Sequence, residues 1–84
     1  MKSIPDNKTP ILVVDDDTGL LLSIKATLVS SGMPDPALVS DSRQVMELVR
    51  KHHFHVVLLD LMMPNLSGME ILQQLKQEFP AVTI

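Results

Sequence analysis

The chain has 84 residues, enough for at most one small domain. Hydrophobic residues make up 45% of it, which supplies a core and excludes a disordered chain. With no cysteine, disulfides and thiolate metal sites are excluded, in keeping with a cytoplasmic location. The net charge of −3 gives no electrostatic footprint for nucleic acid, and the absence of any run of about 18 apolar residues argues against a membrane partner.

The N-terminal residues are polar, and the first expected strand and helix come after them. Residues 1–9 contain a proline and several polar residues, and we expect them to form a flexible leader ahead of a domain over 10–84. The apolar run Ile11–Val14 predicts a strand buried on both faces, as in a parallel sheet. A helix over 19–31 follows, capped by Asp17 or Thr18, with apolar residues at helical spacing.

The rest of the chain repeats this alternation. Ala37–Val39 predicts a weak second strand, followed by a helix that is capped by Asp41 or Ser42 and ends near residue 52. Val56–Leu59 predicts another strand buried on both faces. Ser67 then begins a third helix with Glu70 as its capping-box partner, and Met69 is expected to lie inward. Residues 81–84 indicate a fourth strand just beginning.

Strands that alternate with helices predict an α/β fold with a parallel sheet. The two most apolar strands, Ile11–Val14 and Val56–Leu59, should be central neighbours. Their carboxyl ends would then lie side by side, at the edge where open α/β sheets place their sites.

Acidic residues follow both of these strands. Asp15, Asp16 and Asp17 follow the first, and Asp60 follows the other, so we expect them to converge. Clustered carboxylates repel one another unless a cation lies among them, and oxygen ligands of this kind suit Mg²⁺. A carboxylate beside such a metal can also act as a nucleophile for phosphoryl transfer. Asp17 is more simply explained as a helix cap, whereas Asp60 lies too far ahead of the next helix for that role.

These residues carry a family resemblance. The segments ILVVDDD (11–17) and VVLLDLMMPNLSGMEIL (56–72) resemble the receiver domains of two-component response regulators. The pattern Asp60, Met63, Pro64 and Gly68 makes the resemblance specific, and it covers residues 10–84. The resemblance implies that Pro64 and Gly68 shape the loop and let the third helix pack close. It implies a flavodoxin-like, doubly wound parallel sheet, here incomplete with about four strands and three helices. The segment SGMEIL (67–72) most resembles receivers of the nitrogen-regulatory type.

The resemblance also implies roles for individual residues. Asp60 would accept a phosphoryl group from a sensor histidine kinase, and Mg²⁺ would be its cofactor. Asp16 and Asp60 would bind the metal directly, Asp15 mainly through water, and Met62 through its backbone carbonyl. Such a receiver switches an output domain, which this chain does not contain, and is not a turnover enzyme.

The chain departs from the family pattern in length, because it stops at Ile84, inside the expected fourth strand. A catalytic hydroxyl and a lysine of the family would lie beyond this point, and Thr83 comes too early to replace the hydroxyl. We therefore expect weak Mg²⁺ binding and poor phosphorylation. An exposed edge strand and an apolar flank of the first helix would favour self-association.

Two other functions fit parts of the sequence. Asp15 and Asp17 resemble the start of a haloacid-dehalogenase-like phosphatase, although this leaves Asp60 unexplained. A degenerate receiver could instead serve as a dimerisation or docking module without phosphorylation. The histidines at 52, 53 and 55 are expected at a helix end and a strand start rather than at a metal site.

Overall fold

The computed structural model describes residues 10–63 and 67–84, so the expected leader and Pro64 lie outside the described residues. All three full strands have the predicted bounds. In chain order the elements are β1 (Ile11–Val14), α1 (Thr18–Ser30), β2 (Ala37–Val39), the short 3-10 helix η2 (Ser42–Gln44), α2 (Val45–Lys51), β3 (Val56–Leu59) and α3 (Gly68–Glu78).

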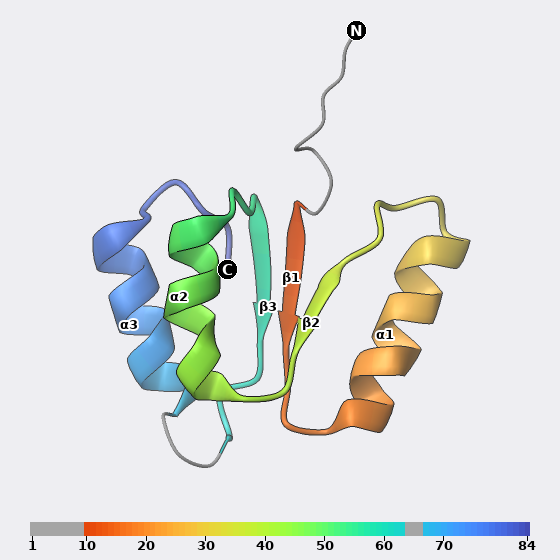
Figure 1. Cartoon of the computed structure of the whole chain (residues 1–84), viewed down its shortest axis with the longest axis horizontal. Helices are drawn as coiled ribbons and strands as arrows, with labels where there is room; N and C mark the ends of the chain where they lie inside the picture. Colours follow the sequence, from red (N-terminus) through yellow and green to blue (C-terminus); the bar gives the residue numbers. More distant parts are fainter. Residues whose placement is uncertain (1–9, 64–66) are drawn as a thin grey trace, which may run out of the picture.

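The three strands form one parallel sheet with β1 in the centre, in the order β2-β1-β3 (Figure 1). β1 and β3 pair from Ile11 opposite Val56 to Val14 opposite Leu59, so their carboxyl ends are level. This confirms that the two most apolar strands are neighbours. The fourth strand expected at 81–84 is present as a single parallel bridge between Val56 and Thr83.

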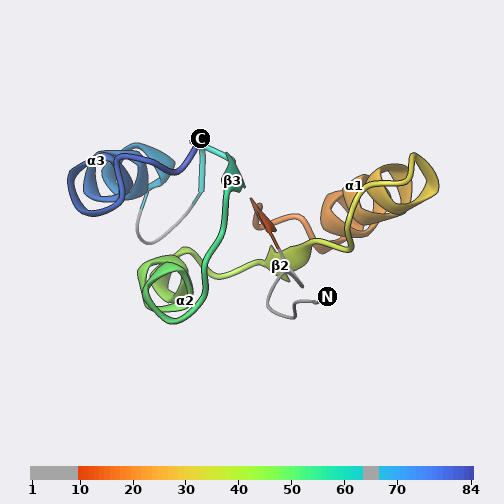
Figure 2. The ribbon, with the colours of Figure 1, turned by 90° about the horizontal axis from the view of Figure 1, so that it is seen from above.

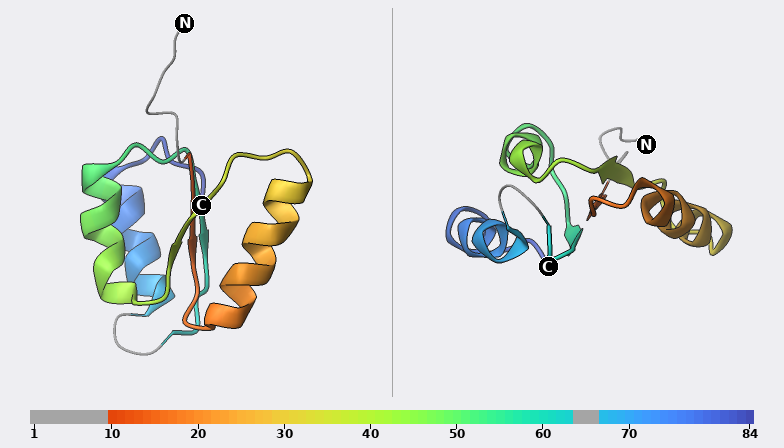
Figure 3. Two further views of the ribbon diagram at one scale, coloured as in Figure 1. Left: turned by 45° about the vertical axis from the view of Figure 1, so that its right-hand side comes forward. Right: turned by 90° about the horizontal axis from the view of Figure 1, so that it is seen from below.

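Helices lie on both faces of the sheet, as a doubly wound fold requires. α1 lies on one side, and α2 and α3 lie together on the other (Figures 2 and 3). Because side chains alternate along a strand, Ile11 and Val13 face α1, whereas Leu12 and Val14 face the helix pair. β1 is therefore buried on both faces, as predicted.

The two faces carry cores of different size. Among the described residues, three buried ones form the core on the α1 side: Ile11, Val13 and Leu21. On the other side, eleven do so: Leu12, Val14, Val39, Val45, Met46, Val49, Phe54, Val57, Met63, Ile71 and Leu75. The layer of α2 and α3 is consequently much better anchored than α1.

β3 departs from the prediction that both its faces are buried. Val57 is fully buried beneath the helix pair, but Leu58, on the α1 side, is 42% exposed. The reason is that α1 covers β1 and β2, and no helix among the described residues covers β3 on that side (Figure 2). The apolar run identified the strand correctly but not its exposed face.

Local signals explain where the helices begin. Asp17 caps α1 by accepting a hydrogen bond from the backbone N–H of Leu20, as expected. Ser67 and Glu70 form the predicted capping box of α3, and caps of this kind contribute about 1 kcal/mol. The second helix is preceded by a 3-10 turn capped by Asp41, so the expected cap is present, whereas the 3-10 geometry was not predicted from the sequence.

The helix faces were predicted less well than the helix bounds. Met69 is 49% exposed, so the expectation that it lies inward was wrong; Gly68, Ile71 and Leu75 are the buried residues of α3. At the second position of α3, Met69 lies on the opposite side of the helix from Ile71. Within the described part of the chain, no helix has the length and apolar character needed to span a bilayer.

Candidate functional site

The sheet holds the backbones of two acidic residues directly beyond the strand ends. The N–H of Asp15 donates to the carbonyl of Val39 at 3.1 Å. The N–H of Asp60 donates to the carbonyl of Val14 at 3.0 Å. Each residue thus continues the hydrogen-bond ladder of the sheet by one step, which gives its side chain a fixed starting point.

A turn of the same kind then orients each of the two carboxylates. Oδ1 of Asp15 accepts from the N–H of Asp17 at 2.9 Å, and Oδ1 of Asp60 accepts from the N–H of Met62 at 2.9 Å. An aspartate that bonds the backbone two residues on forms an Asx turn. Sequence reasoning missed this role of the Met62 N–H, although Asx turns are a known habit of aspartate.

The turns bring three of the predicted acids together. Oxygens of Asp15, Asp16 and Asp60 all lie within 4.8 Å of one another. Asp15 and Asp60 are partly buried and Asp16 is exposed. Among the described residues this is the one cluster of three or more acidic or histidine side chains close enough to share a metal ion, and Asp17 is not part of it.

The electrostatics of this cluster favour a cation. Two unit charges about 4 Å apart repel by roughly 1 kcal/mol in water and by about 4 kcal/mol near a protein surface. The described ion pairs all lie elsewhere, joining Lys25 to Asp35, Arg43 to Asp41, Arg50 to Glu78 and Lys51 to Glu47. An all-oxygen donor set that is not neutralised by a described lysine or arginine fits Mg²⁺.

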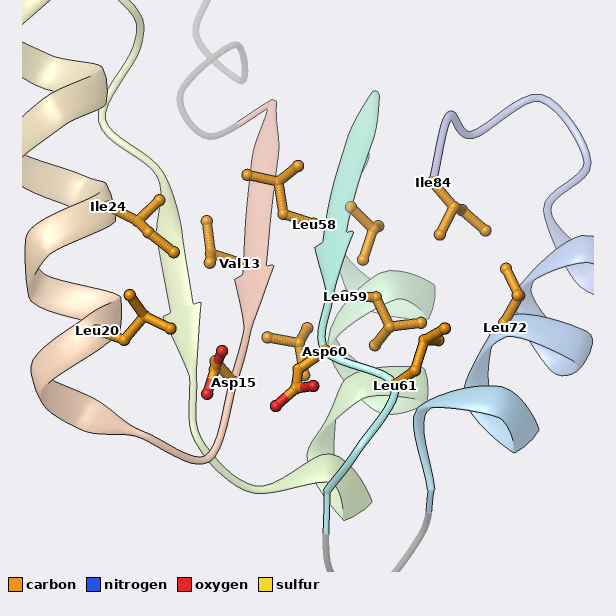
Figure 4. Close-up of a pocket in the computed structure, with 12 residues that line it drawn as sticks. Val13, Asp15, Leu20, Ile24, Leu58, Leu59, Asp60, Leu61, Leu72 and Ile84 are labelled. Atoms are coloured by element: carbon orange, nitrogen blue, oxygen red, sulfur yellow. The ribbon is translucent and has the colours of Figure 1, made fainter.

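An apolar groove begins at these acids and runs along β3 (Figure 4). Its volume is about 740 Å³. Leu20 and Ile24 of α1 form one wall, Leu58 lies on the floor, and Ile84 lies at the other side. The carboxylates of Asp15 and Asp60 lie at one end, so the groove is charged at that end and apolar along the rest of its length.

Other predicted residues are placed as follows. The side chain of Met62 is 86% exposed, and its N–H holds Asp60. Thr83 pairs with the first residue of β3, at the opposite end of the strand from Asp60, so it is not part of the cluster. His52 ends α2 and His55 precedes β3, outside any cluster of ligands in the described part of the chain.

Comparisons with known proteins agree with this arrangement. A family model for the response regulator receiver domain matches residues 11–84. The response regulator MprA of Mycolicibacterium vanbaalenii is 38% identical over 66 residues, covering 79% of this chain and 28% of that protein. The DNA-binding response regulator MtrA of Mycobacterium tuberculosis is 37% identical over 68 residues, covering 81% of this chain and 29% of that protein.

A solved structure shows the same fold. The crystal structure of a response regulator receiver domain protein from Clostridium thermocellum superposes with a TM-score of 0.77 and 32% identity, over 88% of this chain and 60% of that one. The chain thus spans under a third of the length of these two curated relatives. The phosphatase interpretation is not favoured, since its proposed acid, Asp17, caps α1. The chain belongs to the response regulator receiver domain family.

Proposed function

We propose that the chain is the phosphoryl-accepting part of a two-component signalling protein. Asp60 would receive the phosphoryl group from a phosphohistidine of a sensor histidine kinase. The observation that carries this proposal is the meeting of Asp60 with Asp15 and Asp16, within 4.8 Å, beyond the ends of two adjacent parallel strands. Membership of the receiver family supports the same reaction class.

The geometry around Asp60 suits nucleophilic attack. Its Oδ1 is held by the N–H of Met62, which leaves Oδ2 to attack the phosphorus. A P–O bond forms to Asp60 as the P–N bond to the donor imidazole breaks, and the departing nitrogen keeps the electron pair. Hydrolysis of the acyl phosphate restores the carboxylate. In this proposal the phosphoryl group on Asp60 serves as a signal, and the chain acts as a signalling partner in phosphoryl transfer rather than as a turnover enzyme.

The acidic cluster would hold Mg²⁺ during this reaction. Asp16 and Asp60 would bind the ion directly, Asp15 mainly through water, and Met62 through its backbone carbonyl. When bound, Mg²⁺ supplies positive charge that offsets the charge on the transferred phosphoryl group. Asp15 and Asp60 are fixed by the sheet, so they can position the ion without rearrangement of their backbones.

The proposal extends to the setting of the reaction. We place it in the cytoplasm, in keeping with a chain that has no cysteine. The net charge of −3 argues that this segment does not itself bind nucleic acid, so an output domain elsewhere would carry that function. Membership of the nitrogen-regulatory type stays a prediction.

Labelling with a small phosphodonor tests the proposal. The chain is incubated with acetyl phosphate with and without Mg²⁺, and the acyl phosphate is located by mass spectrometry of proteolytic fragments. We expect slow, Mg²⁺-dependent addition of one phosphoryl group at Asp60, because no described lysine or arginine forms an ion pair with the acidic cluster. Labelling at another residue, or no labelling at Asp60, contradicts the proposal.

A second proposal is that the chain self-associates across the groove. Leu58, Leu20 and Ile84 are 42%, 44% and 39% exposed, and together they form an apolar surface that a second copy would cover. The two copies would meet face to face, because each contributes both the bare side of β3 and the apolar flank of α1.

Light scattering over a range of concentrations tests this association. We expect dimers or larger species for the natural chain, and monomers for Leu58→Asp, which places a charge on the groove floor. Met69→Asp is the matched control, because Met69 is 49% exposed on α3 and does not line the groove. A monodisperse monomer at high concentration of the natural chain rules the association out.

A further inference from the structure

The first residue of α3 lies unusually close to the backbone of the phosphoacceptor turn. Gly68 is buried, and a Cβ built on it would overlap the carbonyl oxygen of Asp60 and the Cα of Leu61, and lie 2.9 Å from the carbonyl carbon of Asp60. The other glycines differ: a Cβ on Gly19 would lie 3.4 Å from Asp17, and one on Gly32 would meet nothing within 4 Å. The tight contact is particular to Gly68.

This contact completes the support of the turn. From the sheet side, the carbonyl of Val14 accepts the N–H of Asp60 at 3.0 Å. Within the turn, the N–H of Met62 holds Oδ1 of Asp60 at 2.9 Å. Gly68 closes the remaining side, so the peptide after Asp60 is held between β1 and α3. Displacing this peptide moves the amide that orients the carboxylate.

An added methyl group would displace the turn rather than the helix. α3 is anchored by its capping box and by Ile71 and Leu75, both fully buried. The turn is anchored less well, because Leu61 is 42% and Met62 is 86% exposed. Close-packed interiors resist movement more than exposed turns do, so the strain passes to the turn.

We infer that Gly68 is a positioning residue for Asp60: its missing side chain lets α3 act as a fixed support that sets the carboxylate toward Asp15 and Asp16. The functional consequence rests on the proposed function, since it concerns Mg²⁺ binding and phosphoryl transfer. The structural consequence, a shift of the turn, does not depend on it.

The test is Gly68→Ala, examined with two readouts. Amide chemical shifts of residues 60–62 are measured by NMR without metal, and the Mg²⁺ dissociation constant is measured by calorimetry, since the chain has no Trp or Tyr for fluorescence. We expect clear amide shifts and about tenfold or greater loss of Mg²⁺ affinity, the scale known for supports of metal ligands. Labelling by acetyl phosphate should fall in parallel.

Two controls separate positioning from general stability. Ile71→Val shortens a buried side chain of the same helix and lowers stability without adding an atom near Asp60. Gly19→Ala adds a methyl group in ordinary contact with Asp17, at the start of α1. Both variants should leave the amide chemical shifts of residues 60–62 unchanged. Both should also keep the Mg²⁺ dissociation constant within about twofold of that of the natural chain, well below the loss expected for a metal-ligand support.

The possible outcomes all decide the inference. A folded Gly68→Ala protein with natural shifts at 60–62 overturns it. If that variant does not fold, Ser67→Ala replaces it, because it loosens the first turn of α3 without adding an atom; unchanged amides at 60–62 then overturn the inference, and shifted amides support it. If the natural chain binds no Mg²⁺, the proposed function fails, while the metal-free shifts still test the role of Gly68.

Discussion

Replacing Asp60 with asparagine is expected to abolish phosphoryl transfer to the chain and leave the fold intact. Asparagine has the same shape, and its carbonyl oxygen can still accept the N–H of Met62. It has no carboxylate to attack phosphorus, so acetyl phosphate should leave no label at this position. Mass spectrometry after incubation with Mg²⁺ measures the loss.

The matched control is Asp17→Asn. Asp17 lies in the other acidic loop but caps α1, and asparagine is an equally good cap. This variant should be labelled at Asp60 like the natural chain. An acyl phosphate that persists elsewhere in the Asp60→Asn chain would show that the phosphoacceptor has been assigned to the wrong residue.

Replacing both Asp15 and Asp16 with asparagine should change stability in opposite directions with and without metal. In the natural chain, Mg²⁺ at 100 times its dissociation constant should raise the free energy of unfolding by about 2.7 kcal/mol. The double variant should lose this gain. Without metal it should be more stable than the natural chain, because the repulsion among the three carboxylates is reduced.

Urea unfolding followed by far-UV circular dichroism, with Mg²⁺ and with EDTA, measures both effects. Sodium chloride at matched ionic strength controls for screening of charge. Equal stabilisation of the double variant and the natural chain by Mg²⁺ would place the ion outside the cluster. A double variant that is less stable in EDTA would show that the acids attract other groups more than they repel one another.

The strands could be predicted to the residue because their signal is local. Short, continuous β-branched runs bounded by acids have few other interpretations, so Ile11–Val14 and Val56–Leu59 were placed correctly. The start of α3 was equally legible from Ser67 and Glu70. Exposure was harder, because which face of β3 is covered depends on where α1 packs, and composition alone does not encode that.

The candidate site, too, was predictable from the sequence in one part and not in another. The convergence of Asp15, Asp16 and Asp60 followed from two strands being parallel neighbours, which the alternation of elements implied. The support given by Gly68 was not predictable as a distance, because it depends on the approach of a helix to a turn in three dimensions. A glycine at that position indicates closeness but does not say to which atoms.

The unequal cores of the two faces would give a metal ion bound at the acidic cluster a structural effect. Asp15 and Asp16 lead into α1, which has Leu21 as its buried residue, whereas Asp60 is backed by the firmly held α3. A divalent ion bound by residues of both loops would link α1, which has the smaller core, to the better-packed layer of α2 and α3. Metal binding at this small surface cluster would in this way reduce the mobility of the whole of α1.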